Sequence, residues 1–272
     1  MRGRFLLLRL WTLRVNNSRV SLVNFLSAAS GKFGSDAGVQ PPEITSALDQ
    51  FFAATTESNF ETVDYLYASL IRQLQKSRLL IPLVSESATS DELTQGIQGK
   101  ANQVLSVAYV EGPDGRTVAP VFTSVTAMAL WNDRARPVPF DASKVALAMA
   151  SEGISLMALD PGSEKSLVLR RGSVRALATG EKFQAPSQDS EILDAILEVL
   201  KPQLDLVVTH SVRAGDPTRQ LLGPEIVVSL TLVPGLTASQ LGKITQQLSE
   251  ALYENLVLQE KVDGLGLKVL PA

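Results

Sequence analysis

The sequence contains no cysteine and a single histidine, and these two scarcities exclude much catalytic and metal-binding chemistry. Disulfides, zinc fingers, iron–sulfur clusters and thiol nucleophiles all need cysteine. A Ser-His-Asp triad has only His210 as its base. The next residue, Ser211, lies in the same predicted strand, where neighbouring side chains point to opposite faces. We therefore expect a protein that is not an enzyme, with an enzyme of unrecognised type as the alternative.

The sequence also lacks the patterns that bind nucleotides, cofactors and nucleic acids. It has no G-x-G-x-x-G, P-loop or G-x-S-x-G motif. The net charge of −3 gives no overall basic surface for phosphates. Two arginine pairs, Arg134/Arg136 and Arg170/Arg171, could hold a phosphate, but such pairs are more often solvated surface. We expect no cofactor, no metal site and no nucleic-acid partner.

Long apolar runs are missing from the N-terminal stretch, which is instead basic. Its apolar run Phe5–Leu8 is cut by Arg9, whereas a membrane-crossing helix needs about 20 apolar residues. Residues 1–36 carry six basic residues against one acidic residue, a net charge of +5, so the remaining residues carry −8 of the total of −3. We predict that residues 1–42 are a disordered leader and linker. A basic helix that touches a membrane remains an alternative, without firm association.

Helical and strand patterns begin after this leader. The composition, 45% hydrophobic and 19% charged, is typical of a globular protein. Five apolar residues recur at steps of three and four and predict a helix: Phe60, Val63, Tyr67, Leu70 and Leu74. The apolar run Arg78–Val84 predicts a strand, and Pro82 favours an edge position because proline donates no backbone hydrogen bond. A polar stretch, residues 85–102, reads as a surface insertion, and its Asp91–Glu92 pair as part of a solvated loop rather than a metal site.

The stretch Gly115–Trp131 organises the first part of the chain. It follows a Pro-Asp-Gly turn and predicts the second strand of a hairpin. Thr123 or Ser124 can then cap a short helix that ends near Trp131. Further along, a buried strand ends in the turn Asp160-Pro161-Gly162.

These residues resemble the N-terminal domain of the SseB family, bacterial proteins named for enhanced serine sensitivity. The resemblance rests on Pro120–Ser124 (PVFTS), Trp131 and Leu159–Gly162 (LDPG), and it covers roughly residues 44–177. The family commonly has Asn before the Pro-Gly turn, where this chain has Asp160. The family name is shared with a translocator of a type III secretion system, but that protein is a long helical chain, which the mixed strands and turns here do not fit.

The resemblance implies a second, C-terminal domain, and the patterns after residue 188 agree. We predict an SseB-like domain over residues 43–181, a linker at 182–188, and an α+β domain over 189–272 with the order αββαβ. The fold class is therefore mixed α+β, with two small α/β domains that each pack a short sheet against helices. The face of the second sheet that the helices leave open is a candidate partner-binding surface.

The predicted function is a non-enzymatic protein-interaction or regulatory role in the cytoplasm, which the absence of cysteine suits. The alternative is a sensor of amino acids or anions, in which the helix start after Thr123 binds the ligand through backbone N–H groups. The candidate binding or motif positions are Thr123, Ser124, Trp131, Asp160, Pro161 and Gly162.

Overall fold

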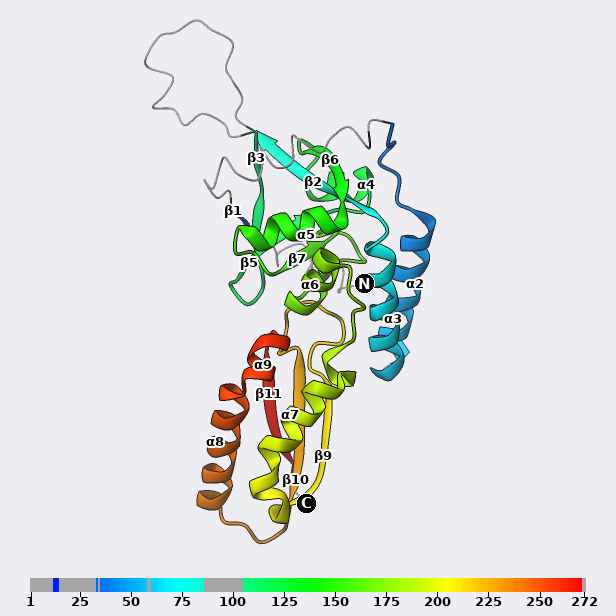
Figure 1. The fold of residues 1–272 in the computed structure, drawn as a ribbon. Helices are drawn as coiled ribbons and strands as arrows, with labels where there is room; N and C mark the ends of the chain where they lie inside the picture. Colours follow the sequence, from blue (N-terminus) through cyan, green and yellow to red (C-terminus); the bar gives the residue numbers. More distant parts are fainter. Residues whose placement is uncertain (1–11, 15–32, 34, 58–59, 86–104, 271–272) are drawn as a thin grey trace, which may run out of the picture.

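The computed structural model describes residues 12–14, 33, 35–57, 60–85 and 105–270. They form two units that lie end to end (Figure 1). Each unit has its own cluster of buried apolar residues, one drawn from residues 44–185 and the other from residues 192–262. The fold is mixed α+β, as the sequence predicted.

The first unit contains two sheets and a helical hairpin. The helices of the hairpin, which pack along each other, are α2 (Pro42–Glu57) and α3 (Phe60–Leu74). The larger sheet has the order β1 (Thr12–Arg14), β4 (Tyr109–Glu111), β5 (Thr117–Val121), β7 (Met157–Leu159) and β8 (Leu167–Leu169). The smaller sheet has the order β3 (Leu105–Val107), β2 (Arg78–Ser85) and β6 (Arg136–Asp141). The remaining helices of this unit are α4 (Val125–Trp131), α5 (Ala142–Ser151) and α6 (Arg171–Thr179).

The edge position expected for the strand around Pro82 is wrong, because β2 lies between β3 and β6. The ladder with β3 begins only at Leu83, beyond the proline. On the other side Pro82 stands opposite Pro137 of β6 at a non-hydrogen-bonded position, because Leu80, two residues earlier, exchanges its backbone hydrogen bonds with Phe122 on the side away from β6. The ladder with β6 therefore loses no hydrogen bond at Pro82, and the strand tolerates a central place.

The predicted hairpin forms between β4 and β5. Val110 pairs with Val118, and the Gly115 amide donates to the Gly112 carbonyl at 2.9 Å. Gly115 has a φ of +80°, a conformation that glycine adopts without strain.

The crossover after β5 places the two sequence motifs side by side. The chain leaves β5, passes through α4, β6 and α5, and returns in β7 parallel to β5. Parallel neighbours end at the same edge of a sheet, so the residues that follow each strand meet there. Thr123 follows β5 and Asp160 follows β7.

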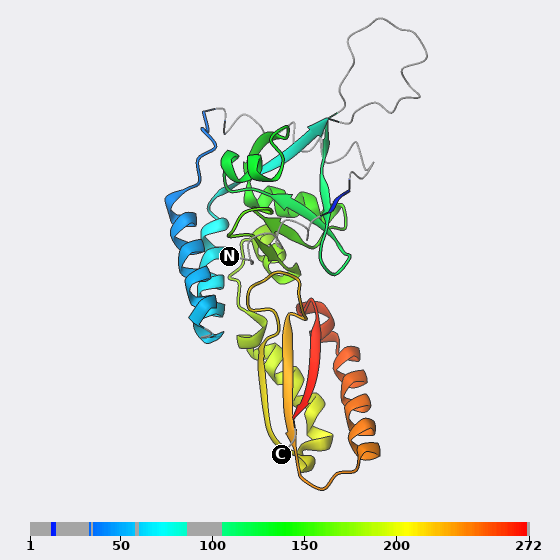
Figure 2. The same cartoon turned by 180° about the vertical axis from the view of Figure 1, so that it is seen from behind.

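The second unit is a three-stranded sheet with helices on one face (Figure 2). The sheet has the order β11 (Leu265–Leu270), β10 (Ile226–Leu232) and β9 (Val207–Ala214), with β11 parallel and β9 antiparallel to β10. The helices are α7 (Ser190–Leu200), α8 (Ala238–Glu254) and the short α9 (Leu256–Lys261). Two 3₁₀ turns complete the unit: η3 (Pro186–Gln188) and η4 (Lys201–Leu206).

The segment predicted as a linker, residues 182–188, connects the two units and packs against them. Its Phe183 and Ala185 belong to the apolar core of the first unit. The Phe183 ring meets the Tyr67 ring edge-on, with centroids 5.5 Å apart. Ser187 donates a hydrogen bond to the Asp64 carboxylate.

Two predictions fall wholly or largely outside the described residues. The surface insertion with Asp91 and Glu92 lies outside them entirely. Most of the predicted leader does too, but Thr12–Arg14 pairs with β4, and residues 36–40 contact the first unit. Within the part of the chain that is described, no helix has the length and apolar character needed to cross a bilayer.

Candidate functional site

The motif residues Thr123 and Ser124 have separate roles at the start of α4. The Ser124 hydroxyl accepts a hydrogen bond from the Ala127 amide at 3.1 Å and so caps the helix. Thr123 instead binds the Asp160 carboxylate twice, through its amide at 2.7 Å and its hydroxyl at 2.6 Å. The two motifs are therefore joined by a buried side-chain contact.

Asp160 occupies an unusual backbone position and an unusual electrostatic environment. Its φ is +49°, in the left-handed region that Asn and Asp tolerate better than most residues. Burial raises the pKa of its carboxyl group to about 6, although the hydrogen bonds from Thr123 and the charge of Arg78 act in the opposite direction. Near neutral pH this carboxylate is thus ionised in a site that disfavours its charge.

Arg78 ties the segment before α2 to this motif. It donates to the Thr123 carbonyl, to the Val39 carbonyl at 2.7 Å and to the Asp36 carboxylate. The Arg78 hydrogen bond lowers the pKa of Asp36. Gln40 adds a bond from its side-chain amide to the Thr123 hydroxyl at 2.6 Å. Residues 36–40 therefore belong to the motif cluster, which the sequence patterns did not indicate.

Trp131 and the Pro-Gly turn complete the cluster. The Trp131 ring lies 5.4 Å from the Phe122 ring, so it holds the end of α4 against the strand edge. Gly162 has a φ of +85°, and a Cβ built on it would lie 3.6 Å from the Trp131 Cα. Pro161, between Asp160 and Gly162, is buried. The structure thus brings all six sequence-derived positions to one edge of the larger sheet.

Three backbone amides around the start of α4 already have acceptors. The Thr123 amide donates to Asp160, the Val125 amide to the Gly38 carbonyl at 2.9 Å, and the Ala127 amide to Ser124. A bound anion would have to replace these contacts, and it would face the Asp160 carboxylate. The geometry therefore favours a structural role for these amides.

A groove of about 770 Å³ lies beside the motif cluster. Residues 37–40, α4 and the turn at 160–165 contribute most of its lining. Three apolar side chains around it are exposed: Val39 by 71%, Leu130 by 62% and Val125 by 36%. The neighbouring motif groups are bonded within the chain, so the exposed apolar side chains and a few polar residues of the turn, such as Ser163 and Lys165, are what the groove offers a ligand.

A second group of polar side chains is buried between the two units. Arg170 is 2% exposed and forms ion pairs with Asp216 at 2.7 Å and with Asp263 at 3.1 Å. Arg219, also 2% exposed, pairs with Asp64 at 2.6 Å, and its guanidinium lies 4.4 Å from the centre of the Tyr67 ring. The expectation that Arg170 is solvated surface is therefore wrong for this residue, because its two acidic partners come from the second unit.

Burial and the neighbouring arginines shift the pKa values of several groups in this buried cluster. Burial raises the pKa of Tyr67 to about 12, so the phenol stays protonated and bonds to the Ser173 hydroxyl at 2.8 Å. Burial also raises the pKa of Glu225. Burial acts in the same direction on Asp263, but the hydrogen bonds and charges of Arg116 and Arg170 together outweigh it, and the net shift lowers the pKa of Asp263. These groups are enclosed and bonded to one another, so they hold the units together rather than present a reactive site.

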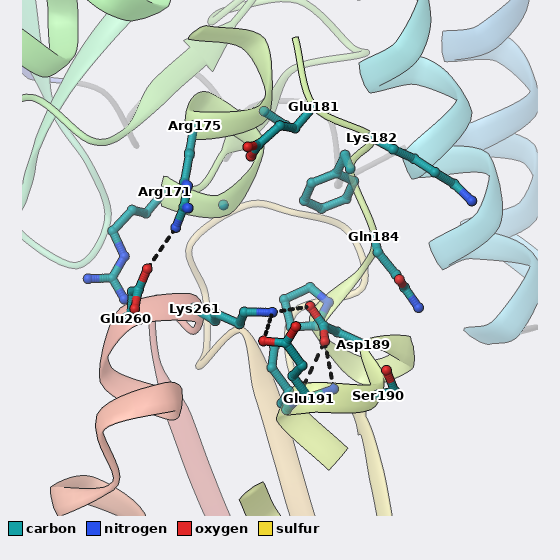
Figure 3. Close-up of a pocket in the computed structure, with 15 residues that line it drawn as sticks. Arg171, Arg175, Glu181, Lys182, Gln184, Asp189, Ser190, Glu191, Glu260 and Lys261 are labelled. Atoms are coloured by element: carbon teal, nitrogen blue, oxygen red, sulfur yellow. Dashed lines mark hydrogen bonds and ion pairs between the residues drawn. The ribbon is translucent and has the colours of Figure 1, made fainter. Parts of the chain in front are cut away.

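A smaller cavity of about 310 Å³ opens beside this interface, between α6, the segment at 181–192 and α9 (Figure 3). Charged side chains of both signs line it. Lys261 pairs with Asp189 at 3.1 Å and with Glu191 at 2.7 Å, and Arg175 pairs with Glu260 at 3.0 Å. These pairs link α6 to α9 and α9 to the start of α7, so the cavity walls join the two units.

The single histidine takes no part in any of these clusters. His210 lies exposed on β9 opposite Leu230, and Ser211 stands opposite Ser229 on the other face of the sheet. Among the described residues, no three His, Cys, Asp or Glu side chains are grouped so that they could hold a metal ion.

The fold and these clusters define a two-unit α+β protein whose motif residues fix a strand edge beside an apolar groove. Residues 59–176 match the family model of the SseB protein N-terminal domain. The chain therefore carries an SseB domain, as the motifs at residues 120–124 and 159–162 indicated. The match does not extend into the second unit, whose assignment as the second SseB-family domain stays a prediction. Searches of the curated proteins and of the solved structures found no match.

Proposed function

We propose that this protein is a non-enzymatic interaction protein that binds another protein through the groove beside the motif cluster. One observation carries the proposal: Val39, Val125 and Leu130 are exposed together around a groove whose motif groups are already bonded. Adjoining apolar side chains on a surface are typical of a binding site. The partner then contributes apolar side chains to the groove, and we place the interaction in the cytoplasm.

A matched pair of leucines tests this proposal. Leu130 borders the groove and Leu147 on α5 is exposed to a similar extent, 62% against 54%, away from the groove lining. The tagged protein should capture a specific partner from its own cells. Leu130→Asp should abolish that capture and Leu147→Asp should leave it unchanged. Repeated recovery of no specific partner, or equal recovery by both variants, would contradict the proposal.

The second candidate function is a sensor of small zwitterions such as amino acids, the role that the serine sensitivity of the family suggests. The cavity in Figure 3 supports it because charged side chains of both signs line it, and a zwitterion could exchange with the exposed Arg175–Glu260 ion pair. Thermal-shift measurements with amino acids, keto acids and nucleotides should then show stabilisation by at least one compound, and Arg175→Ala should reduce it. If no compound shifts the melting temperature, the sensor role is wrong.

A further inference from the structure

The sheet of the second unit has one face that no helix of the described chain covers (Figure 2). On the covered face, Ile226, Val228 and Leu230 of β10 are buried against α7 and α8 in one apolar cluster. Side chains alternate along a strand, so the residues between them point away from the helices. With their register partners they form the open face: Thr209, Ser211, Arg213, Val227, Ser229, Thr231, Gly266, Lys268 and Leu270.

The open face carries positive charge and hydroxyl groups but no carboxylate. Arg213 and Lys268 are exposed, and neither has an ion-pair partner among the described residues. Two hydroxyl pairs, Ser211 with Ser229 and Thr209 with Thr231, stand opposite each other across β9 and β10. In the described part of the chain, none of these four hydroxyls has an acceptor. This donor-rich surface belongs to a protein whose net charge is −3.

We propose that this open face binds an amphipathic helix of a partner protein that carries acidic side chains. Carboxylates of the helix would meet Arg213 and Lys268, and its apolar residues would lie against Val227, Gly266 and Leu270. Charge complementarity supports this occupant, because the face carries two cations and no carboxylate, and its hydroxyl groups can also donate to carboxylates. This proposal rests on the proposed function in one respect, namely that the ligand is a protein. The groove of the first unit is a separate surface.

The dimensions of the face fit one helix. Three strands about 4.8 Å apart span about 10 Å, and six residues at about 3.3 Å each span about 20 Å. A helix is about 10 Å wide and rises about 1.5 Å per residue, so about 13 residues would cover this length. The small side chains in the middle of the face allow close approach, and a helix there would complete a second layer like that formed by α7 and α8.

A second copy of the chain is a poorer occupant. Two open faces brought together would place Arg213 and Lys268 of each copy against those of the other, and the unpaired like charges would repel. Nucleic acid is also a poorer ligand, because two cations on a protein of net negative charge provide little phosphate binding.

Photo-crosslinking in the full chain tests the proposal. A benzoylphenylalanine replaces Ser229 in the middle of the open face, and in the control it replaces Ser239, which is exposed at the start of α8. Illumination in cells that make the protein should give a crosslink at 229 and none to the same protein at 239. Mass spectrometry should map the crosslink to a helical segment with net negative charge.

Charge reversal then tests the mechanism. Arg213→Glu with Lys268→Glu should lower the crosslink yield at 229 about ten-fold, because two attractive contacts become repulsive. Lys76→Glu with Lys243→Glu makes the same change in net charge at exposed positions away from the face and should leave the yield within about two-fold. Raising the salt concentration should also lower the yield of the unreversed protein, which tests the same charges even where the double variant folds poorly.

Several outcomes would overturn the inference: no crosslink, a crosslink to a second copy or to nucleic acid, or one to a segment without net negative charge. A yield that is unchanged by charge reversal would do the same. The Leu130→Asp variant separates this inference from the proposed function. If Leu130→Asp abolishes capture of the groove partner and the crosslink at 229 still forms, both proposals stand. If the crosslink at 229 forms but no partner is captured through the groove, only the proposed function is overturned.

Discussion

Asp160 shows how one residue position combines backbone and charge requirements. Its positive φ favours Asn or Asp, and its carboxylate accepts two bonds from Thr123 in a buried site. Motif spacing in the sequence identified the position. Its raised pKa depends on burial beneath elements that are distant in the chain, so spacing could not indicate it.

Replacing Asp160→Asn should change how stability depends on pH. The pKa of Asp160 is about 6 in the folded protein and about 3.8 in the unfolded chain, so the folded state binds the extra proton between these values. The free energy of unfolding that this group contributes therefore falls as pH rises from about 4 to 6. The stability of Asp160→Asn relative to the unsubstituted protein should rise over that window by about 1–3 kcal/mol.

Urea denaturation at a series of pH values from 4 to 8 measures this difference. Comparing the two proteins at each pH cancels the contributions of other groups, such as Asp36, whose pKa is lowered. A difference that stays constant across the series would show that the Asp160 carboxyl does not titrate in this range.

At the scale of elements, turns and helix periods were well indicated by the sequence. The Pro-Asp-Gly turn forms between β4 and β5, and the apolar period from Phe60 to Leu74 forms α3. Both depend on residues within a few positions of each other. The place of β2 was not indicated, because Pro82 is tolerated through its register with β6, a strand that lies far along the chain.

Two glycines should respond in opposite directions to alanine. Gly115→Ala should lower the free energy of unfolding by about 1 kcal/mol, because a side chain is strained at its φ of +80°. Gly242→Ala, inside α8 with no atom within 4 Å of the added Cβ, should raise it by about 0.5–1 kcal/mol. Thermal or urea unfolding checks both. Equal effects would mean that the turn conformation at Gly115 does not contribute.

At the scale of the whole molecule, the buried ion pairs join the two units. Besides Arg170 and Arg219, the loop between β9 and β10 contributes Leu221, which packs with residues of the larger sheet. The Val168 amide also donates to the Arg219 carbonyl in this loop at 2.7 Å. We therefore expect the two units to unfold together.

Arg170→Met should break this coupling. It removes the ion-pair partner of the buried Asp216 carboxylate, which keeps only hydrogen bonds from its own loop, and losing one partner of a buried pair costs about 3–5 kcal/mol. Calorimetry should then show two transitions where the unsubstituted protein shows one. Arg175→Ala removes an ion pair that also crosses between the units but is exposed, and should cost less than about 1 kcal/mol. A single transition in Arg170→Met with little loss of stability would argue against the coupling.

The sequence by itself determined the local structure and the similarity of residues 59–176 to the SseB N-terminal domain. Helix periods, the hairpin turn, the capping residues and the motifs at residues 120–124 and 159–162 are set by residues close together in the chain. The tertiary structure decided which polar groups are buried and which surfaces remain open. Arg170 and Asp216 are 46 residues apart, and Arg219 and Asp64 are 155 apart. Burying a charge costs free energy, and here only acidic partners from distant parts of the chain offset that cost. No local sequence pattern could therefore distinguish these arginines from solvated ones. The same holds for the groove and the open sheet face, since exposure depends on which layers the fold places over them.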